Sequence, residues 1–409
     1  MNLNQLLLEY INDPYNGKKN YDLGLYYYEI GQTASALSFF LRCAEWGDDD
    51  NLTYESLIMV GLCLSRQNRR YNSEMGVYMQ AIRHNPNRPE AYYFLSLLYE
   101  RKAEWLECNI NSVLSFNLRQ NARPAVYDFD WREYKTVFQN AISSWWIGQI
   151  DQCDSLFYEI ADKYGYDLDE SHKNSVLNNI KFLGLYNHKH LNYTKEQYHK
   201  VKSKFKDLEK VERNYSQVMQ DLFVLTMLNG KKQGTYLEIG SGHAFHGSNT
   251  ALLDTKFNWK GISIDYNPDY IESFKDRNST HLIKDALSID YSKLLSDNKF
   301  PKNIDYLQLD CDPTDITYEA LLKIPFDEYK FAVITFEHDA YTDDNKYRDL
   351  SREYLISKGY QLVIDNVAPD RLCSFEDWWI HPDLVDKYIV DNFRIISNMA
   401  KKPTDFMFL

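Results

Sequence analysis

The stretch GTYLEIGSGHAFHGSNT, Gly234–Thr250, decides the fold of the second half of this 409-residue chain. Its first residues are mostly apolar, which predicts a short buried strand, and they enclose one carboxylate, Glu238. Gly240 and Gly242 then predict a tight turn, and Ser-Asn-Thr predicts the start of a helix. A strand, a glycine turn and a helix in this order form the ligand-binding corner of many α/β sheets, so the question is which ligand accepts an acid beside the turn.

The residues around the turn discriminate between ligands. A dinucleotide fingerprint needs a third glycine, but Phe245 stands at that position, and a phosphate-binding loop needs a Gly-Lys-Ser or Gly-Lys-Thr triplet that the stretch lacks. The charge of Glu238 would also repel a pyrophosphate. S-adenosylmethionine carries a sulfonium and an ammonium group, so a nearby acid favours it. The turn therefore predicts S-adenosylmethionine as the cofactor.

Apolar runs separated by helical or turn-rich segments follow the turn. The runs that suit buried parallel strands are Thr235–Ile239, Gly261–Ile264, His281–Ile283, Ile304–Leu309 and Phe331–Phe336. Two later stretches, GYQLVIDNV and FRIISNM, are expected to add closing strands at one edge. Alternating strands and helices predict a doubly wound, Rossmann-like α/β sheet whose ligand lies beyond the carboxyl ends of the strands.

Acids also end the next two predicted strands. Asp265 closes GISID, where a carboxylate can accept hydrogen bonds from both ribose hydroxyls, and Asp285 closes HLIKD, where it can accept from the adenine amino group. Together with Glu238, these acids strengthen the prediction of the cofactor. The other expected cofactor contacts are Gly240, Ser241, Gly242, Tyr266, Ala286 and Asp310.

Several segments of the second half carry a resemblance to a known family. YSQVMQDLFVL, GTYLEIGSGHAFHGSNTALLDTKFNWKGISIDYN, IDYLQLDCDP and FEDWWIHP together resemble the FkbM-type methyltransferases, over roughly Tyr215 to Pro382. The resemblance implies a class I S-adenosylmethionine-dependent enzyme, a type that often O-methylates sugar hydroxyls on glycans or natural products. It also implies that Gln217 and Asp221 line the cofactor entrance. The chain departs from the family after the fourth strand, where DCDP, 310–313, replaces the pattern D-x-E-G.

Methyl transfer to a sugar hydroxyl needs a base or a metal ion, because the hydroxyl is a poor nucleophile at neutral pH. The strand-end candidates are Asp310, Asp312, Glu337, His338 and Asp339. His338 is the favoured general base, since histidine titrates near neutrality, and Asp310 and Asp339 complete the expected catalytic group. In an alternative, Asp310 with Glu337 or Asp339 ligates Mg²⁺. Trp378, Trp379 and His381 either offer an aromatic face to a sugar or cover the sheet.

The first half of the chain repeats internally. The repeated anchor positions are Gly24, Ala36, Phe40 and Cys43, then Leu62, Glu74, Tyr78 and Ala81, then Ser96, Cys108, Ser112 and Ser115, and finally Ala141, Cys153, Phe157 and Ile160. Small residues at the first anchors let paired helices approach closely, and the pattern resembles the tetratricopeptide repeat, with its period of about 34 residues. Such repeats stack and curve around a concave groove, which predicts docking of a protein or peptide partner.

Aromatic side chains are the candidate contacts of that groove. They are Tyr27, Tyr28, Tyr92, Tyr93, Trp145 and Trp146. Aromatic stripes at helical spacing are also common in helix packing, so packing between the helices is the alternative for each of them.

Composition limits the remaining possibilities. The net charge of −13 lacks the basic surface that binds nucleic acid or an anionic membrane, and no apolar run reaches membrane-spanning length. The scattered cysteines predict buried thiols in a reduced compartment, so we expect a soluble, cytoplasmic protein. The expected domains are the helical repeats at 1–187, a solvated connecting helix at 188–213 and the methyltransferase-like α/β domain at 214–409.

The leading hypothesis is an S-adenosylmethionine-dependent O-methyltransferase that acts on a carbohydrate or glycoconjugate and is recruited by its repeats. The alternative is a non-catalytic adaptor in which the repeats act and the α/β domain is an inactive relic. A nucleotide-dependent oxidoreductase is a third possibility, and the missing third glycine counts against it.

Overall fold

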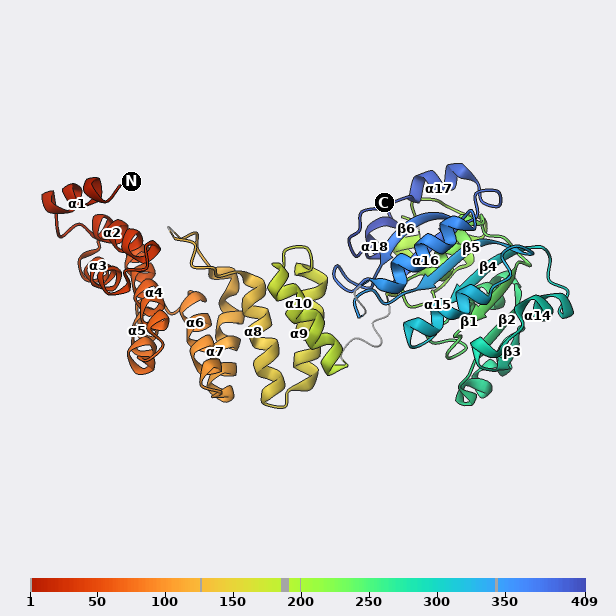
Figure 1. Ribbon diagram of the computed structural model, residues 1–409, viewed down its shortest axis with the longest axis horizontal. Coiled ribbons are helices and arrows are strands. Elements are labelled where there is room, and N and C mark those ends of the chain that lie inside the picture. Colours follow the sequence, from red (N-terminus) through yellow and green to blue (C-terminus); the bar gives the residue numbers. More distant parts are fainter. Residues whose placement is uncertain (1, 126, 185–190, 199, 343–344) are drawn as a thin grey trace. The chain divides into compact units, whose positions relative to one another are not determined.

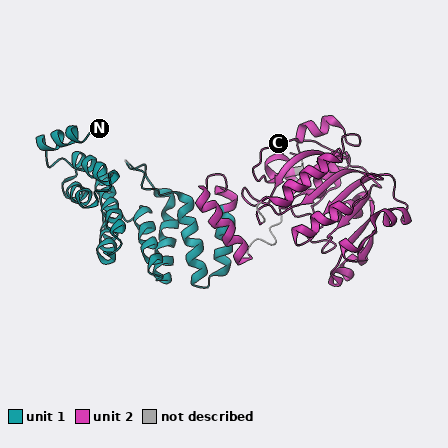
Figure 2. Ribbon diagram, in the orientation of Figure 1, with its two compact units in different colours: residues 1–160 teal, residues 161–409 magenta. Residues whose placement is uncertain are grey.

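The computed structural model describes residues 2–125, 127–184, 191–198, 200–342 and 345–409. Contacts between residues divide the chain into two compact units, residues 1–160 and 161–409 (Figure 2). This division falls within helix α9 (Ile150–Tyr164), so α10 (Glu170–Leu183) belongs to the second unit. The expected domain boundary at residues 187 and 188 lies outside the described residues.

The first unit is built of helices that pack in sequence order (Figure 1). They are α1 (Leu3–Asn12), α2 (Gly17–Glu29), α3 (Thr33–Trp46), α4 (Asp50–Gln67), α5 (Tyr71–His84), α6 (Glu90–Arg101), α7 (Trp105–Leu118), α8 (Glu133–Trp146) and the first part of α9. The predicted helical repeats are confirmed as the pairs α2–α3, α4–α5, α6–α7 and α8–α9.

Glycine allows the paired helices to approach closely. An ideal Cβ at Gly24 of α2 would lie 2.6 Å from the ring of Phe40 of α3, and one at Gly61 of α4 would lie 2.2 Å from the ring of Tyr78 of α5. Gly61 is therefore the structural counterpart of Gly24. The predicted anchor, Leu62, lies one position after Gly61, because the spacing between anchors is not constant from one repeat to the next.

The second unit contains a seven-stranded sheet in the order β3-β2-β1-β4-β5-β7-β6. The strands are β1 (Thr235–Ile239), β2 (Lys260–Asp265), β3 (Thr280–Ile283), β4 (Asn303–Leu309), β5 (Lys330–Glu337), β6 (Gln361–Val367) and β7 (Glu376–Ile380). The first five are parallel, and β7 runs antiparallel between β5 and β6. The five strands predicted after the glycine turn are thus confirmed, as is GYQLVIDNV.

The last strand of the sheet was predicted wrongly. FRIISNM, residues 393–399, forms only an isolated bridge, between Ile395 and Ile364 of β6. The strand that the sequence did not predict is β7, EDWWI, in which Trp378 and Trp379 are both fully buried. These tryptophans point to opposite faces of the sheet and pack into its two cores, so the reading in which they cover the sheet is confirmed.

Apolar cores lie on both faces of the sheet, as expected for parallel strands buried on two sides. One face packs against α12 (Gln220–Met227), α13 (Ala251–Phe257) and α17 (Lys387–Phe393). The other packs against α14 (Tyr291–Asp297), α15 (Thr314–Lys323) and α16 (Lys346–Ser357) (Figure 1). The unit also contains α18 (Pro403–Phe406) and the short 3-10 helices η3 (Pro268–Asp276) and η4 (Ala286–Ser288).

The expected connecting helix is not formed in the residues that the structure describes there. Between 191 and 213 they contain only the four-residue α11 (Lys195–Tyr198) and the 3-10 turn η2 (Leu208–Lys210). Val201, Phe205 and Val211 are buried in the core of the second unit. The mixed charges of this segment therefore conceal an apolar side that packs on the sheet domain.

Candidate functional site

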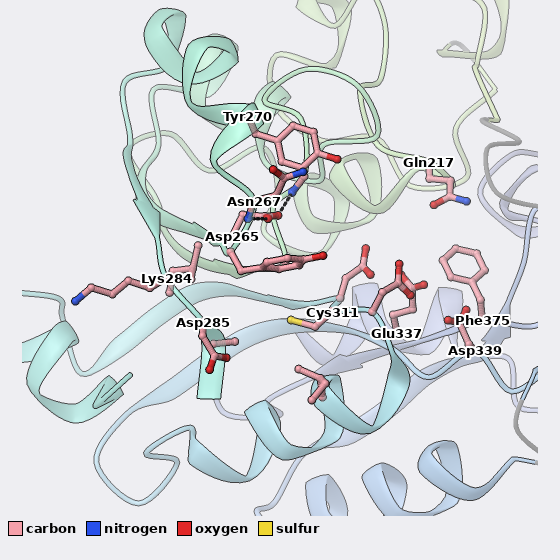
Figure 3. Close-up of a pocket in the computed structure, with 18 of the residues that line it drawn as sticks. Gln217, Asp265, Asn267, Tyr270, Lys284, Asp285, Cys311, Glu337, Asp339 and Phe375 are labelled. Atoms are coloured by element: carbon pink, nitrogen blue, oxygen red, sulfur yellow. Dashed lines mark hydrogen bonds between the residues drawn. The ribbon is translucent and has the colours of Figure 1, made fainter. Parts of the chain in front are cut away.

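A cavity of about 660 Å³ opens at the carboxyl ends of the parallel strands. The strand order reverses between β1 and β4, which is where open α/β sheets bind their ligands. Residues directly after several strands reach the cavity wall, among them Gly240 after β1, Tyr266 after β2, Asp310 after β4 and Asp339 near the end of β5. Figure 3 shows side chains from these elements converging on one space.

The predicted glycine turn forms one side of the cavity. Gly240 has a φ of +80°, which favours glycine, and an ideal Cβ there would lie 1.5 Å from the carbonyl oxygen of Asp310. Gly242 has a φ of +56°, and its N–H donates to Asp265 Oδ2 over 2.8 Å. Gly240 therefore lets the chain after β1 pass close to the chain after β4, and Gly242 attaches the turn to β2.

Asp265 lies in the cavity wall at the end of β2, where the sequence places it. Its carboxylate accepts the N–H of Gly242 at Oδ2 and the N–H of Asn267 at Oδ1, each over 2.8 Å. Each carboxylate oxygen has a further lone pair that can accept a hydroxyl of a ligand. The next residue, Tyr266, is 76% exposed, so its ring is accessible to a planar group in the cavity.

The cavity wall is strongly acidic. Its carboxylates belong to Asp265, Asp285, Asp310, Asp312, Glu337 and Asp339. Lys284 is the one basic side chain among the described residues of this wall, and in Figure 3 it extends away from the carboxylates. Asp285 and Ala286 reach the wall after β3, as predicted, and Asp285 Oδ1 accepts the N–H of Leu287 over 2.9 Å. Such a wall favours a ligand that carries positive charge.

Glu238 lies beneath the turn, which corrects the prediction that it contacts the cofactor. Its side chain is only 1% exposed, because it shares one face of β1 with the buried Tyr236. Its Oε2 accepts the hydroxyls of Thr250 (2.8 Å) and Ser263, and burial raises the pKa of the carboxyl. Ser241 is buried as well, and its Oγ has no hydrogen-bond partner among the described residues.

Arg277 holds the loop that follows the glycine turn, a role that the sequence analysis missed. Its buried guanidinium donates to Asp254 Oδ2 (2.9 Å), to the carbonyl of Ala244 (2.6 Å) and to the hydroxyls of Thr250 (2.7 Å) and Tyr236 (3.0 Å). These groups belong to the turn loop, α13 and β1. Nothing in the polar stretch around Arg277 signals this role, because its partners lie 23 to 41 residues away.

The acids after β4 and at the end of β5 form a cluster. Glu337 hydrogen-bonds with both Asp310 and Asp339, and all three line the cavity. Burial and mutual repulsion raise the pKa of each carboxyl, to about 6 for Asp310 and about 7 for Asp339. The cluster therefore retains a proton near neutral pH, and Asp339 changes charge in the range that suits a general base.

His338 does not face the cavity, so its assignment as the general base is wrong. The side chain is 1% exposed, and its Nε2 lies 3.4 Å from Oδ1 of the buried Asp377. Arg352 donates to the same carboxylate over 2.6 and 2.8 Å, and burial lowers the pKa of the imidazole. The chain leaves β5 after Glu337, and the N–H groups of His338 and Asp339 both donate to the carbonyl oxygen of Phe375. Glu337 and Asp339 line the cavity, whereas His338 does not.

Gln217 lines the cavity, but Asp221 does not. Asp221 is fully buried, and its carboxylate accepts the N–H of Tyr215 (2.8 Å) and the hydroxyl of Ser216 (2.6 Å), which shapes the segment before α12. His381 is 6% exposed after β7, so it cannot offer its ring to a sugar in the cavity.

Within the described residues, no group of three or more His, Cys, Asp or Glu side chains has the arrangement needed to hold a metal ion. In the same part of the chain, no helix combines the length and the apolar character that crossing a membrane requires.

No protein-family model matches the chain, and no curated protein matches it. The helical region of the first half resembles solved tetratricopeptide-type structures. MamA is 17% identical over 37% of this chain and 80% of its own, with a TM-score of 0.30. PilF of Pseudomonas aeruginosa is 13% identical over 38% and 65%, with a TM-score of 0.32. YrrB, a TPR protein with an unusual peptide-binding site, is 12% identical over 44% and 81%, with a TM-score of 0.34.

Proposed function

We propose that the second unit is an S-adenosylmethionine-dependent O-methyltransferase whose acceptor is a sugar hydroxyl of a glycan or glycoconjugate. The observation that carries the proposal is the acid-lined cavity at the point where the strand order reverses, beside the Gly240 turn. Phosphate-bearing cofactors would meet only repulsion from these carboxylates, whereas a sulfonium and an ammonium are attracted. The sheet order also fits the doubly wound fold that the FkbM resemblance implies.

The chain's own residues divide into a cofactor side and an acceptor side. On the cofactor side, Asp265 accepts the ribose hydroxyls, Tyr266 lies against the adenine, and Asp285 accepts the adenine amino group. When bound, the cofactor supplies an activated methyl group. On the acceptor side, Asp310, Glu337 and Asp339 surround the place where the hydroxyl is held in line with that group. Asp339 replaces His338 as the base that receives the hydroxyl proton.

Binding of S-adenosylhomocysteine, measured by calorimetry, tests the cofactor assignment. We expect the wild-type protein to bind it and Asp265→Ala to bind it about 10- to 100-fold more weakly, because two charge-assisted hydrogen bonds are lost. Asp269→Ala is the matched control, since Asp269 is an exposed acid four residues away that does not line the cavity. ATP and NAD should not bind. The assignment fails if the wild type ignores S-adenosylhomocysteine at millimolar concentration.

The acid cluster predicts a pH-dependent stability. Asp339 has a folded pKa of about 7 against about 3.9 in an unfolded chain, so the folded state binds more protons between these values and its stability falls progressively as pH rises from about 4 to about 7. Asp339→Asn removes this effect. We expect the variant to melt about 2–4 °C above the wild type at pH 8, the shift that about 1 kcal/mol produces, and to show a smaller advantage at pH 5, where only part of the stability has been lost.

Thermal melts at both pH values, with Glu319→Gln as the control, check this prediction. Glu319 is an exposed acid on α15 outside the cavity wall. An equal shift at pH 5 and pH 8 would contradict the raised pKa. Repeating the melts at pH 8 with MgCl₂ tests the metal alternative, which requires a stabilisation of the wild type that Asp339→Asn abolishes.

The adaptor alternative keeps the repeats as the active part of the protein. It predicts partner binding through the first unit and no effect of S-adenosylhomocysteine on the second. The preserved Gly240 turn and the positions of Asp265 and Asp285 in one wall favour the enzyme, because an inactive relic has no need of an open cavity here.

A further inference from the structure

The chain between α7 and α8 lies across helices that precede it by many residues. The ring of Tyr127 packs edge-on against Tyr28 of α2, with 5.7 Å between centroids. The ring of Phe129 packs edge-on against Phe94 of α6 at 6.2 Å. We call residues 127–131, with the sequence YDFDW, the aromatic segment. Figure 1 shows the connection that contains it as a long excursion between α7 and α8.

The aromatic segment covers one side of the helix stack. Phe129 is only 7% exposed and belongs to the apolar core of the first unit, and Tyr127 and Trp131 pack against the same core. The ring contacts of the segment reach α2 and α6. These helices and α4, which lies between them in the repeat order, are the first helices of successive repeats, so equivalent positions on them face the same side. Tyr28, a predicted groove contact, packs against Tyr127 and is 6% exposed. Tyr93, another of them, is 7% exposed and packs against Phe94, the partner of Phe129.

The acids of the aromatic segment pair with basic residues that follow it. Asp128 accepts both Nη1 (2.8 Å) and Nη2 (2.7 Å) of Arg132, and Asp130 accepts Lys135 Nζ over 2.7 Å. The contact with the helices is therefore made mainly by the aromatic residues at alternate positions, while the charges hold the segment in its shape. This division is typical of a bound peptide whose aromatic anchors fill pockets of its receptor.

We propose that the aromatic segment is a tethered ligand of the face formed by α2, α4 and α6. A protein partner of this face presents an extended peptide with aromatic residues at the Tyr-x-Phe-x-Trp spacing and binds by displacing the segment. A tether of this length gives the segment an effective concentration of about 1 mM, so the intact protein binds such a partner weakly until the segment is released.

A fluorescent peptide with the sequence of residues 127–133, YDFDWRE, tests this proposal by anisotropy against the full chain. The Tyr127→Ser/Phe129→Ser variant, whose segment lacks its anchors, should bind the peptide about 100-fold more tightly than the wild type, the ratio expected for a peptide of about 10 μM affinity competing with the tether. A peptide with serine at both anchor positions is the control. Equal binding to both proteins, or none to the folded variant, overturns the proposal.

Hydrogen exchange of the wild-type chain gives a second test if the variant does not fold. At 2 mM peptide, the amides of residues 127–131 should exchange several-fold faster, because the peptide takes their place, whereas the amides of α2 and α6 should not. Unchanged exchange overturns the proposal. So does a dimer by size-exclusion chromatography whose segments are exchanged, since the occupant would then be a second copy of the chain.

Discussion

Gly240→Ala should abolish binding of S-adenosylhomocysteine and destabilise the second unit by about 4 kcal/mol or more, a value reached only when a substitution forces the backbone to move. The added methyl group would overlap the carbonyl oxygen of Asp310, 1.5 Å away, so the chains after β1 and β4 must separate. Because both chains line the cavity, the same movement misplaces the turn and the acid cluster.

Gly359→Ala is the matched control for this variant. Gly359 ends α16 with a φ of +86°, close to the +80° of Gly240, but an ideal Cβ there meets nothing within 4 Å. The control carries the backbone strain, about 1–2 kcal/mol, without the collision, and should bind S-adenosylhomocysteine as the wild type does. Chemical denaturation and calorimetry measure both effects. Similar losses in the two variants would show that strain, and not the approach of the two chains, explains the role of Gly240.

Arg277→Met should cost about 3–5 kcal/mol, the range found when one partner of a buried ion pair is removed. Asp254 would keep a charge in a fully buried position, and the carbonyl of Ala244 would lose a donor at 2.6 Å. A loss of this size lowers the melting temperature of a unit of this length by roughly 10 °C. It should also weaken S-adenosylhomocysteine binding well below the melting temperature, because the loop after the glycine turn is released.

Lys275→Met serves as the control for Arg277→Met. Lys275 lies two residues earlier and pairs with Glu272 at the surface, so its loss should change stability by less than about 1 kcal/mol. Arg277→Lys keeps the charge but cannot reach all the acceptors of the guanidinium fork, and we expect an intermediate result. If Arg277→Met lowers stability but leaves the affinity for S-adenosylhomocysteine unchanged, Arg277 is structural only and does not position the turn.

The residues of the candidate site differ in how far local pattern could predict them. Gly240 and Asp265 follow buried strands in a parallel sheet, and the carboxyl ends of such strands necessarily share one edge. Their place in the cavity wall is therefore readable without a structure. His338 was misjudged because its position directly after β5 and its reference pKa both suit a general base. Its burial beside Asp377 of β7 depends on a strand distant in the sequence.

Other features have no local signal. EDWWI suits a surface-exposed aromatic patch as well as a buried strand, and only its insertion between β5 and β6 buries Trp378 and Trp379 on both faces. Arg277 donates hydrogen bonds to acceptors far away in the sequence. Phe129 likewise packs against Phe94 of α6, which precedes it by many residues. Periodicity describes how a segment presents its own side chains, but it carries no information about which distant segment meets them.

For this protein, the sequence alone specified the helical repeat unit through the spacing of its small and aromatic anchor residues. The apolar periodicity specified the five parallel strands, and the glycines and acids at the strand ends specified most of one cavity wall. Packing alone decided the seventh strand, the burial of Glu238 and His338, and the occupation of the repeat face by residues 127–131. The physical reason is that an amphipathic pattern selects a face, whereas the partner of that face is selected by shape, desolvation and charge across the whole fold.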